Sequence, residues 1–137
     1  MKTSLIILLC LISLTGYTQE AANPQADTIQ WSYSEMHNTT NGDTLHFNGN
    51  FISYGTSGIL WTQDGGRQYY FKVNAVEGSW EDISANGGVT YEVACDGVTG
   101  TLVISRISGI IKIAVDLGEP GQLTPHLLIA INTCSKV

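Results

Sequence analysis

Large apolar residues alternate with small or polar residues along most of the chain after residue 27. In the segment 28–36, for example, Ile29, Trp31 and Tyr33 stand at every second position, with Gln30 and Ser32 between them. A period of two places one face of a β-strand on the core and the other face in water. The pattern therefore predicts a half-buried strand at the start of the domain.

Seven further segments show strand-like patterns, and none has a helical period. They cover residues 45–51, 59–62, 69–76, 89–95, 101–107, 110–117 and 127–131. Glycine-rich turns separate them, among them Asn41-Gly42-Asp43, Asp64-Gly65-Gly66 and Ser108-Gly109. The last segment is apolar on both faces, which predicts a central or barrel-closing strand rather than an exposed edge.

About eight short strands with regular turns predict a single all-β domain over residues 28–137. Both a small antiparallel up-and-down barrel and a two-sheet β-sandwich fit this pattern. Consecutive hairpins favour the barrel, because closure removes the sheet edges that a monomer must otherwise protect. Gly49 interrupts one apolar face, where a bulge or a close backbone approach is expected.

The N-terminus carries the order of a secretory signal. Lys2 precedes the apolar run Leu5–Leu14, and small or polar residues follow it, which predicts a cleaved signal peptide over residues 1–18, with cleavage at Ala21 or Ala22 as the nearby alternatives. The run is about half the roughly 20 residues that span a bilayer, so a stable membrane anchor is the weaker interpretation, and lipid modification of Cys10 is a further alternative. The mature protein is expected to be exported: secreted, periplasmic or at the cell surface. Residues 19–27 are expected to form a disordered leader.

The chain is acidic, and its cations are few and scattered. The formal charge is −6, and without Lys2 five cations face twelve acids, which gives −7. Phosphate binding requires clustered lysines and arginines. The composition therefore argues against nucleic acid and anionic lipid as partners.

Only two cysteines remain after the signal. In an oxidising compartment two such thiols usually pair, so a Cys95–Cys134 disulfide is predicted. It would tie down the C-terminal strand. Free thiols acting as a redox pair or as metal ligands are the alternative, although no Cys-x-x-Cys spacing supports them.

No motif in the sequence completes a catalytic or metal site. The segment Gly55–Ile59 lacks the second glycine of a nucleophile elbow, and the histidines lack the spacing of a local metal pair. An enzyme would require His46 or His126 to meet an acid in a cleft, or Glu81-Asp82 to act beside Trp80. We therefore expect no catalytic residues, no metal and no cofactor.

The fragment Gly78-Ser79-Trp80 is similar to the Gly-x-Trp motif of lipocalins, in which the tryptophan plugs the closed end of a barrel. In that family the motif precedes the barrel strands, whereas here it falls in mid-chain. We therefore assign no family and interpret Trp80 as a core or rim aromatic that follows a glycine bend.

Aromatic residues suggest a binding function. Tyr69 and Tyr70 are adjacent in a predicted strand, so one should enter the core and the other should face solvent or a ligand. The candidate ligand-binding residues are Trp31, Trp61, Tyr70 and Trp80. They predict a non-catalytic binding module for a small apolar or carbohydrate ligand. The alternative is a structural or protein-interaction domain, such as an inhibitor or cell-surface component, with a filled core.

Asn38-Thr39-Thr40 also has the form of a glycosylation acceptor.

Overall fold

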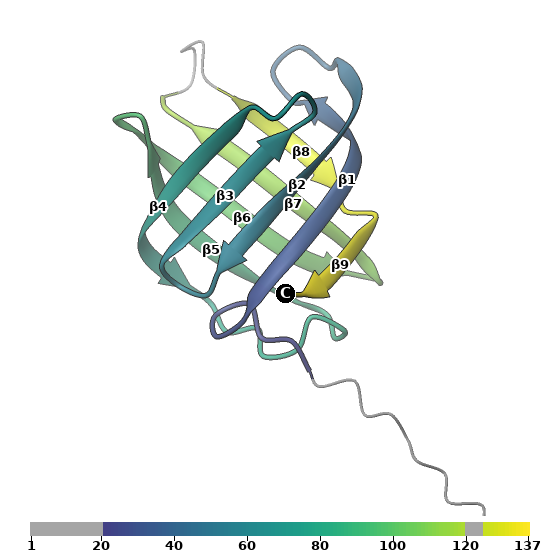
Figure 1. Ribbon diagram of the computed structural model, residues 1–137, viewed down its shortest axis with the longest axis vertical. Coiled ribbons are helices and arrows are strands. Elements are labelled where there is room, and N and C mark those ends of the chain that lie inside the picture. The colour runs from purple at the N-terminus through teal and green to yellow at the C-terminus, as the bar shows by residue number, and fades with distance from the viewer. Residues whose placement is uncertain (1–20, 120–124) are drawn as a thin grey trace, which may run out of the picture.

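The computed structural model describes residues 21–119 and 125–137, which form nine antiparallel β-strands (Figure 1). The signal peptide predicted over residues 1–18 lies outside the described residues. The strands are β1 (Thr28–Asn38), β2 (Thr44–Tyr54), β3 (Gly58–Gln63), β4 (Gln68–Glu77), β5 (Gly87–Cys95), β6 (Val98–Ile107), β7 (Ile110–Leu117), β8 (His126–Ala130) and β9 (Thr133–Lys136).

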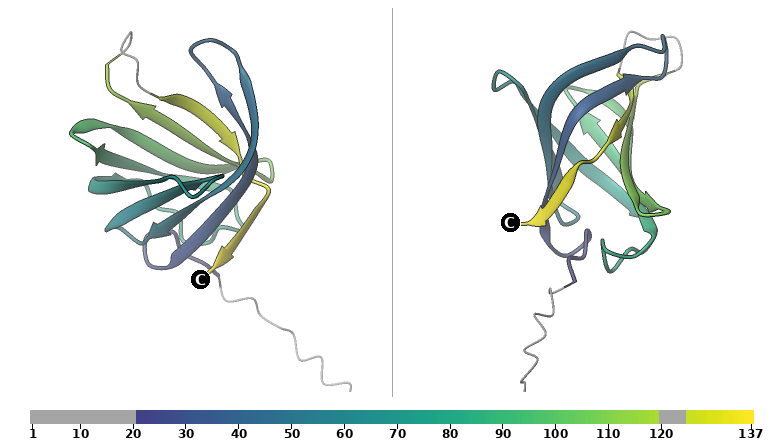
Figure 2. Two further views of the ribbon diagram at one scale, coloured as in Figure 1. Left: turned by 45° about the horizontal axis from the view of Figure 1, so that its top comes forward. Right: turned by 90° about the vertical axis from the view of Figure 1, so that its right-hand side faces the viewer.

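Strands β1 to β8 close into an up-and-down barrel. Each strand pairs with the next in the chain, and β8 returns to β1 through the pairs His37–Leu128 and Asn38–Leu127. Figure 2 shows the strands surrounding one interior from two further directions. The barrel prediction is thereby confirmed, and the sandwich is excluded.

Strand β9 is an addition that the sequence pattern did not predict. After β8 the chain bends at Asn132, whose backbone N–H bonds to the Ser32 carbonyl and whose side chain bonds to the Ser34 hydroxyl. The chain then pairs with Ile29–Ser32 of β1, whereas β8 pairs with His37 and Asn38 further along the same strand. The segment Thr133–Lys136 is short and polar, so it carries no apolar alternation from which a strand could be recognised.

The inward-facing side chains form one core along the barrel axis. The largest fully buried side chains are Trp31, Tyr91, Phe51, Phe71, Ile29, Ile59, Leu102, Ile104, Ile113, Ile129, Val89 and Val93. Trp31 donates its indole N–H to the Ser53 hydroxyl at 2.9 Å, which satisfies the buried polar group of both residues.

One end of the barrel, hereafter the closed end, is covered by residues 21–27 and by the β4–β5 loop, residues 78–86. Trp80 from that loop is 2% exposed, and its ring stacks on Trp31 with the centroids 6.1 Å apart. Its indole N–H donates to the Ala85 carbonyl at 2.9 Å. The indole also lies against Gly87, where a β-carbon would collide with the ring. Trp80 is therefore a core residue, as its position after a glycine bend predicted.

The described part of the expected disordered leader, residues 21–27, is folded against this end. Asn23, Ala26 and Asp27 form a hydrogen-bonded turn, and the Tyr91 hydroxyl donates to the Pro24 carbonyl. Asp27 pairs with Lys136 at 3.2 Å. The backbone N–H of Asn23 and the Lys136 ammonium hold the pKa of Asp27 below its usual value. These contacts join residues 21–27 to β5 and β9, which lie far along the chain. The composition of residues 19–27, from which disorder was expected, gives no information about such contacts.

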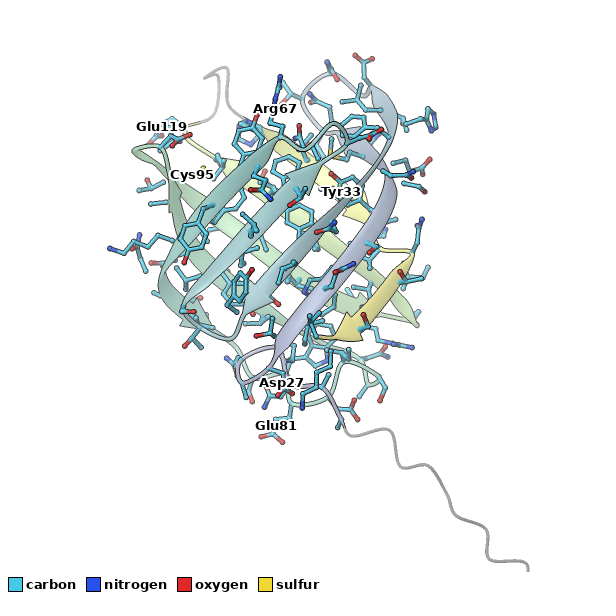
Figure 3. All side chains as sticks on the ribbon, in the orientation of Figure 1. Asp27, Tyr33, Arg67, Glu81, Cys95 and Glu119 are labelled. Atoms are coloured by element: carbon cyan, nitrogen blue, oxygen red, sulfur yellow. The ribbon has the colours of Figure 1, made fainter. Side chains whose placement is uncertain are left out.

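The predicted Cys95–Cys134 disulfide is wrong, because both thiols are free. Cys95 pairs with Val98 at the start of β6, and Figure 3 labels it near the upper end. Cys134 lies on β9, near Arg106 at the other end of β6. The distance from Val98 to Arg106 along the strand is about 26 Å at about 3.3 Å per residue. A disulfide requires α-carbons within about 7 Å, so these two cysteines cannot bridge in this fold.

Free thiols give a direct test by mass spectrometry. When the protein is unfolded in the presence of N-ethylmaleimide and without reductant, we expect Cys95 and Cys134 each to take up one label. Peptide mapping assigns the two labels, and a sample reduced before labelling is the control. A disulfide-linked pair of Cys95 and Cys134 peptides that appears only in the unreduced sample would contradict the structure, which places the two cysteines near opposite ends of β6.

Across residues 21–119 and 125–137, no helix has the length and apolarity needed to cross a bilayer.

Candidate functional site

The end of the barrel opposite Trp80, hereafter the open end, contains a cavity of about 680 Å³. This volume lies within the range of pockets that hold small molecules. Its apolar wall includes Met36, Phe47, Trp61, Tyr69, Phe71 and Leu127. Its polar lining comprises Asn38, Thr40, Asn41, Gln63, Arg67 and Asp96.

The distribution of these residues follows from strand geometry. Within β3 and β4 every second side chain points inward, so Trp61, Tyr69 and Phe71 reach the interior from neighbouring strands. The polar members lie at strand ends or in turns, as Gln63 and Arg67 do. The cavity therefore has an apolar interior beneath a polar rim.

Trp61 is held in place by a buried hydrogen bond. Its indole N–H donates to the Tyr33 hydroxyl at 2.7 Å. The Tyr33 ring lies directly over Gly49, where a β-carbon would collide with it, so the nearest group at this glycine is a side chain rather than the expected backbone. A register shift between Tyr33 and Glu35 adds a bulge in the adjoining β1–β2 pair. Burial raises the pKa of Tyr33, which keeps the hydroxyl neutral beside the indole.

Aromatic rings surround Trp61 on several sides. The ring centroid of Phe51 lies 5.1 Å away, that of Tyr69 5.6 Å and that of Phe71 6.3 Å. Packed rings of this kind are stiff, because each restrains the rotamers of its neighbours. The apolar wall is consequently preformed.

The structure separates the four sequence-predicted ligand-binding residues. Trp61 lines the cavity, whereas Trp31 and Trp80 stack on each other toward the closed end and do not line it. Tyr70 is 54% exposed on the outer surface. Its ring covers Gly58 there, where a β-carbon would meet the ring.

Most residues that line the cavity were not among the sequence candidates, and Tyr69 is the one for which the sequence held the clearest signal. Alternation correctly assigned Tyr69 and Tyr70 to opposite faces, and the same period of two places Tyr69 on one face with Phe71 and Val73. Phe71 is 1% exposed, so that shared face is the inner one. The apolar residues at the second and fourth positions after Tyr69 were therefore the available signal for its inward orientation.

Among the lining residues that the structure describes, the rim carries one cation and one anion. Arg67 follows Gly65-Gly66, both at positive φ, in the β3–β4 turn. Asp96 has a φ of 50° in the two-residue β5–β6 turn. Figure 3 shows Arg67 at the upper end of the barrel, well away from Asp27 and Glu81 at the closed end. The opposite charges of Arg67 and Asp96 leave the described part of the lining without net charge.

Cys95 contributes a thiol to the wall. Burial raises its pKa, and the neighbouring Asp96 carboxylate raises it further. A thiol with a raised pKa is a weak nucleophile near neutral pH, because little thiolate is present. Cys95 is therefore suited to packing rather than to covalent chemistry.

Neither His46 nor His126, the two histidines considered for a catalytic role, lines the cavity. His46 contacts Glu35 at 3.5 Å, and His126 contacts Asp116 at 3.0 Å, but neither pair lines it. Within the described part of the chain, no group of three His, Cys, Asp or Glu side chains is placed to hold a metal ion. The cavity thus offers contact surface and a few hydrogen-bonding groups.

Comparison of the chain with protein-family models, with curated proteins and with solved structures found no match. The function is therefore inferred from the geometry of this barrel.

Proposed function

We propose that this protein is a non-catalytic binding module that holds a small, largely apolar ligand in the open end of its barrel. The observation that carries the proposal is the cavity of about 680 Å³ with aromatic and aliphatic walls. Removing apolar ligand surface from water contributes about 25 cal/mol per Å². A preformed wall avoids much of the ordering cost that binding would otherwise incur.

The wall chemistry favours an apolar ligand over a carbohydrate. Sugars require several convergent hydrogen-bonding groups, whereas Phe47, Trp61 and Leu127 present carbon surface. The polar residues at the rim fit a ligand whose polar part remains near water. A structural or protein-interaction domain with a filled core remains the alternative, and an open cavity argues against it.

Export belongs to the same proposal. The apolar run near the N-terminus and its flanking residues favour delivery outside the cytoplasm as a secreted, periplasmic or surface protein. There the barrel would bind its ligand, while the acidic surface disfavours nucleic acid.

A charge placed in the wall tests the proposal. We expect wild-type protein to bind N-phenyl-1-naphthylamine, an apolar fluorophore, with increased emission. Phe47 is half-buried in the wall, and Phe47→Asp should weaken binding roughly tenfold or more, because a carboxylate in an apolar site must stay hydrated. Fluorescence titration measures both affinities.

The matched control is Ile110→Asp. Ile110 is 56% exposed beside the β6–β7 turn and does not line the cavity, so the same type of change should leave the affinity unaltered. The probe should also slow alkylation of Cys95 but not of Cys134. Equal affinity in wild type and Phe47→Asp, or no binding by wild type, would overturn the proposal.

A further inference from the structure

One side of the open end has an unpaired strand edge next to the cavity. Strand β4 begins at Gln68, but its first pair with β5 is Lys72–Ala94. Strand β5 stops early because Asp96-Gly97 turns the chain tightly into β6. The first four residues of β4 therefore pair with β3 alone.

Figure 1 shows the same arrangement from the front. Strands β4 and β5 run together toward the closed end and diverge toward the upper end, and the tip of the β3–β4 hairpin leans outward in the right view of Figure 2. The cavity borders this divergence, because Tyr69 and Phe71 line it from β4 and Cys95 from β5.

The backbone register identifies which groups face the gap. The N–H of Gln63 bonds to the Arg67 carbonyl, and the N–H of Val73 bonds to the Ser57 carbonyl. Odd-numbered residues of this part of β4 thus direct their N–H and C=O toward β3, since the direction alternates along a strand. Even-numbered residues direct theirs toward β5.

Gln68 and Tyr70 are the two even-numbered residues ahead of the first β5 pair. Neither backbone has a hydrogen-bond partner among the residues that the structure describes. Together they present two donors and two acceptors along one line. Such an edge is a template for another strand.

We infer that the ligand of the cavity is a short extended peptide segment that adds to this edge of β4. The inference rests on the proposed function and specifies the ligand class. Two residues of the peptide pair with Gln68 and Tyr70. The residue between them pairs with Tyr69, so its side chain points, like that of Tyr69, into the cavity. The expected pattern is therefore one bulky apolar residue flanked by two residues whose side chains face outward.

The unpaired edge of β4 specifies the ligand class, which the apolar wall alone does not. An apolar cavity accepts any hydrocarbon of suitable size, whereas alternating donors and acceptors beside it fit the peptide backbone. Main-chain bonds would supply orientation, and the cavity would select the central side chain.

Capped tripeptides test this inference directly. Ac-Ala-Phe-Ala-NHMe should bind in an NMR titration and slow hydrogen exchange of the Gln68 and Tyr70 amides. The same peptide with both alanine nitrogens methylated keeps the apolar side chain but loses the donors. Its affinity should fall by at least fivefold, the loss expected for one hydrogen bond. Ac-Ala-Ser-Ala-NHMe, which lacks the apolar side chain, should bind weakly or not at all.

A backbone change in the protein gives the reciprocal test. Gln68→Pro removes the backbone N–H that faces β5 at the first residue of β4. Proline is tolerated at this position, and no hydrogen bond to β3 is lost. It should weaken binding of Ac-Ala-Phe-Ala-NHMe about fivefold, while Gln68→Ala, which keeps the N–H, should not. Unchanged N-phenyl-1-naphthylamine affinity in both variants shows that the cavity is intact.

The outcomes separate the two proposals. If the fluorophore binds but the methylated peptide or Gln68→Pro causes no loss, the peptide inference is overturned and the apolar binding function stands. If wild-type protein does not bind the fluorophore, the proposed function fails, and the peptide inference that rests on it fails as well.

Discussion

Replacing Trp80 by alanine is expected to lower the free energy of unfolding by about 3–5 kcal/mol. Trp80 is 2% exposed, stacks on Trp31 and donates to the Ala85 carbonyl. Alanine would leave a void between the β4–β5 loop and the core, and it would remove the surface that closes the barrel against water. Urea unfolding followed by far-ultraviolet circular dichroism measures the loss without depending on tryptophan emission.

Two controls separate packing from ligand binding. Trp80→Phe keeps a ring on Trp31 but removes the indole N–H, so about 1–2 kcal/mol should be lost. Folded Trp80→Ala should bind N-phenyl-1-naphthylamine with unchanged affinity, because Trp80 does not line the cavity. A stability loss below 1 kcal/mol would contradict the structure of the closed end. Lost affinity in the folded variant would restore Trp80 as a ligand-binding residue.

The barrel was predictable because its determinants are local. Alternation from Thr28 to Met36 and the glycine turns specify strands and hairpins, and an apolar last segment such as Leu127–Ile131 fits a closing strand. The errors concern contacts between distant segments. The compartment suggested pairing of Cys95 with Cys134, but strand register places these cysteines near opposite ends of the barrel.

The candidate site was only partly predictable for a related reason. Alternation placed Tyr69 and Tyr70 on opposite faces, but identifying the inner face required comparison with the buried Phe71. Aromatic character also does not distinguish Trp61, which lines the cavity, from Trp31, which packs under Trp80. That difference depends on how far along the barrel axis each ring lies. The unpaired edge of β4 arises from the unequal lengths of two paired strands, which hydrophobic patterning does not encode.

The pH dependence of stability should show the burial of Tyr91. Loss of solvation in the core raises the pKa of Tyr91 to about 12, against 10.0 for the ordinary phenol. Below pH 10 the folded and unfolded states both keep the proton, and the free energy of unfolding is unaffected. Above pH 10 the unfolded state loses it first, so stability falls as pH rises until the folded pKa is passed. Two pKa units correspond to about 3 kcal/mol.

Tyr91→Phe should remove this part of the alkaline decline. At neutral pH the variant should lose about 1 kcal/mol with the hydrogen bond to the Pro24 carbonyl. Between pH 10 and 12 its curve should fall less steeply than that of wild type and then cross it, as urea unfolding at a series of pH values would show. Parallel curves for wild type and Tyr91→Phe would mean that the Tyr91 hydroxyl reaches water, and the closed end would then be open to solvent.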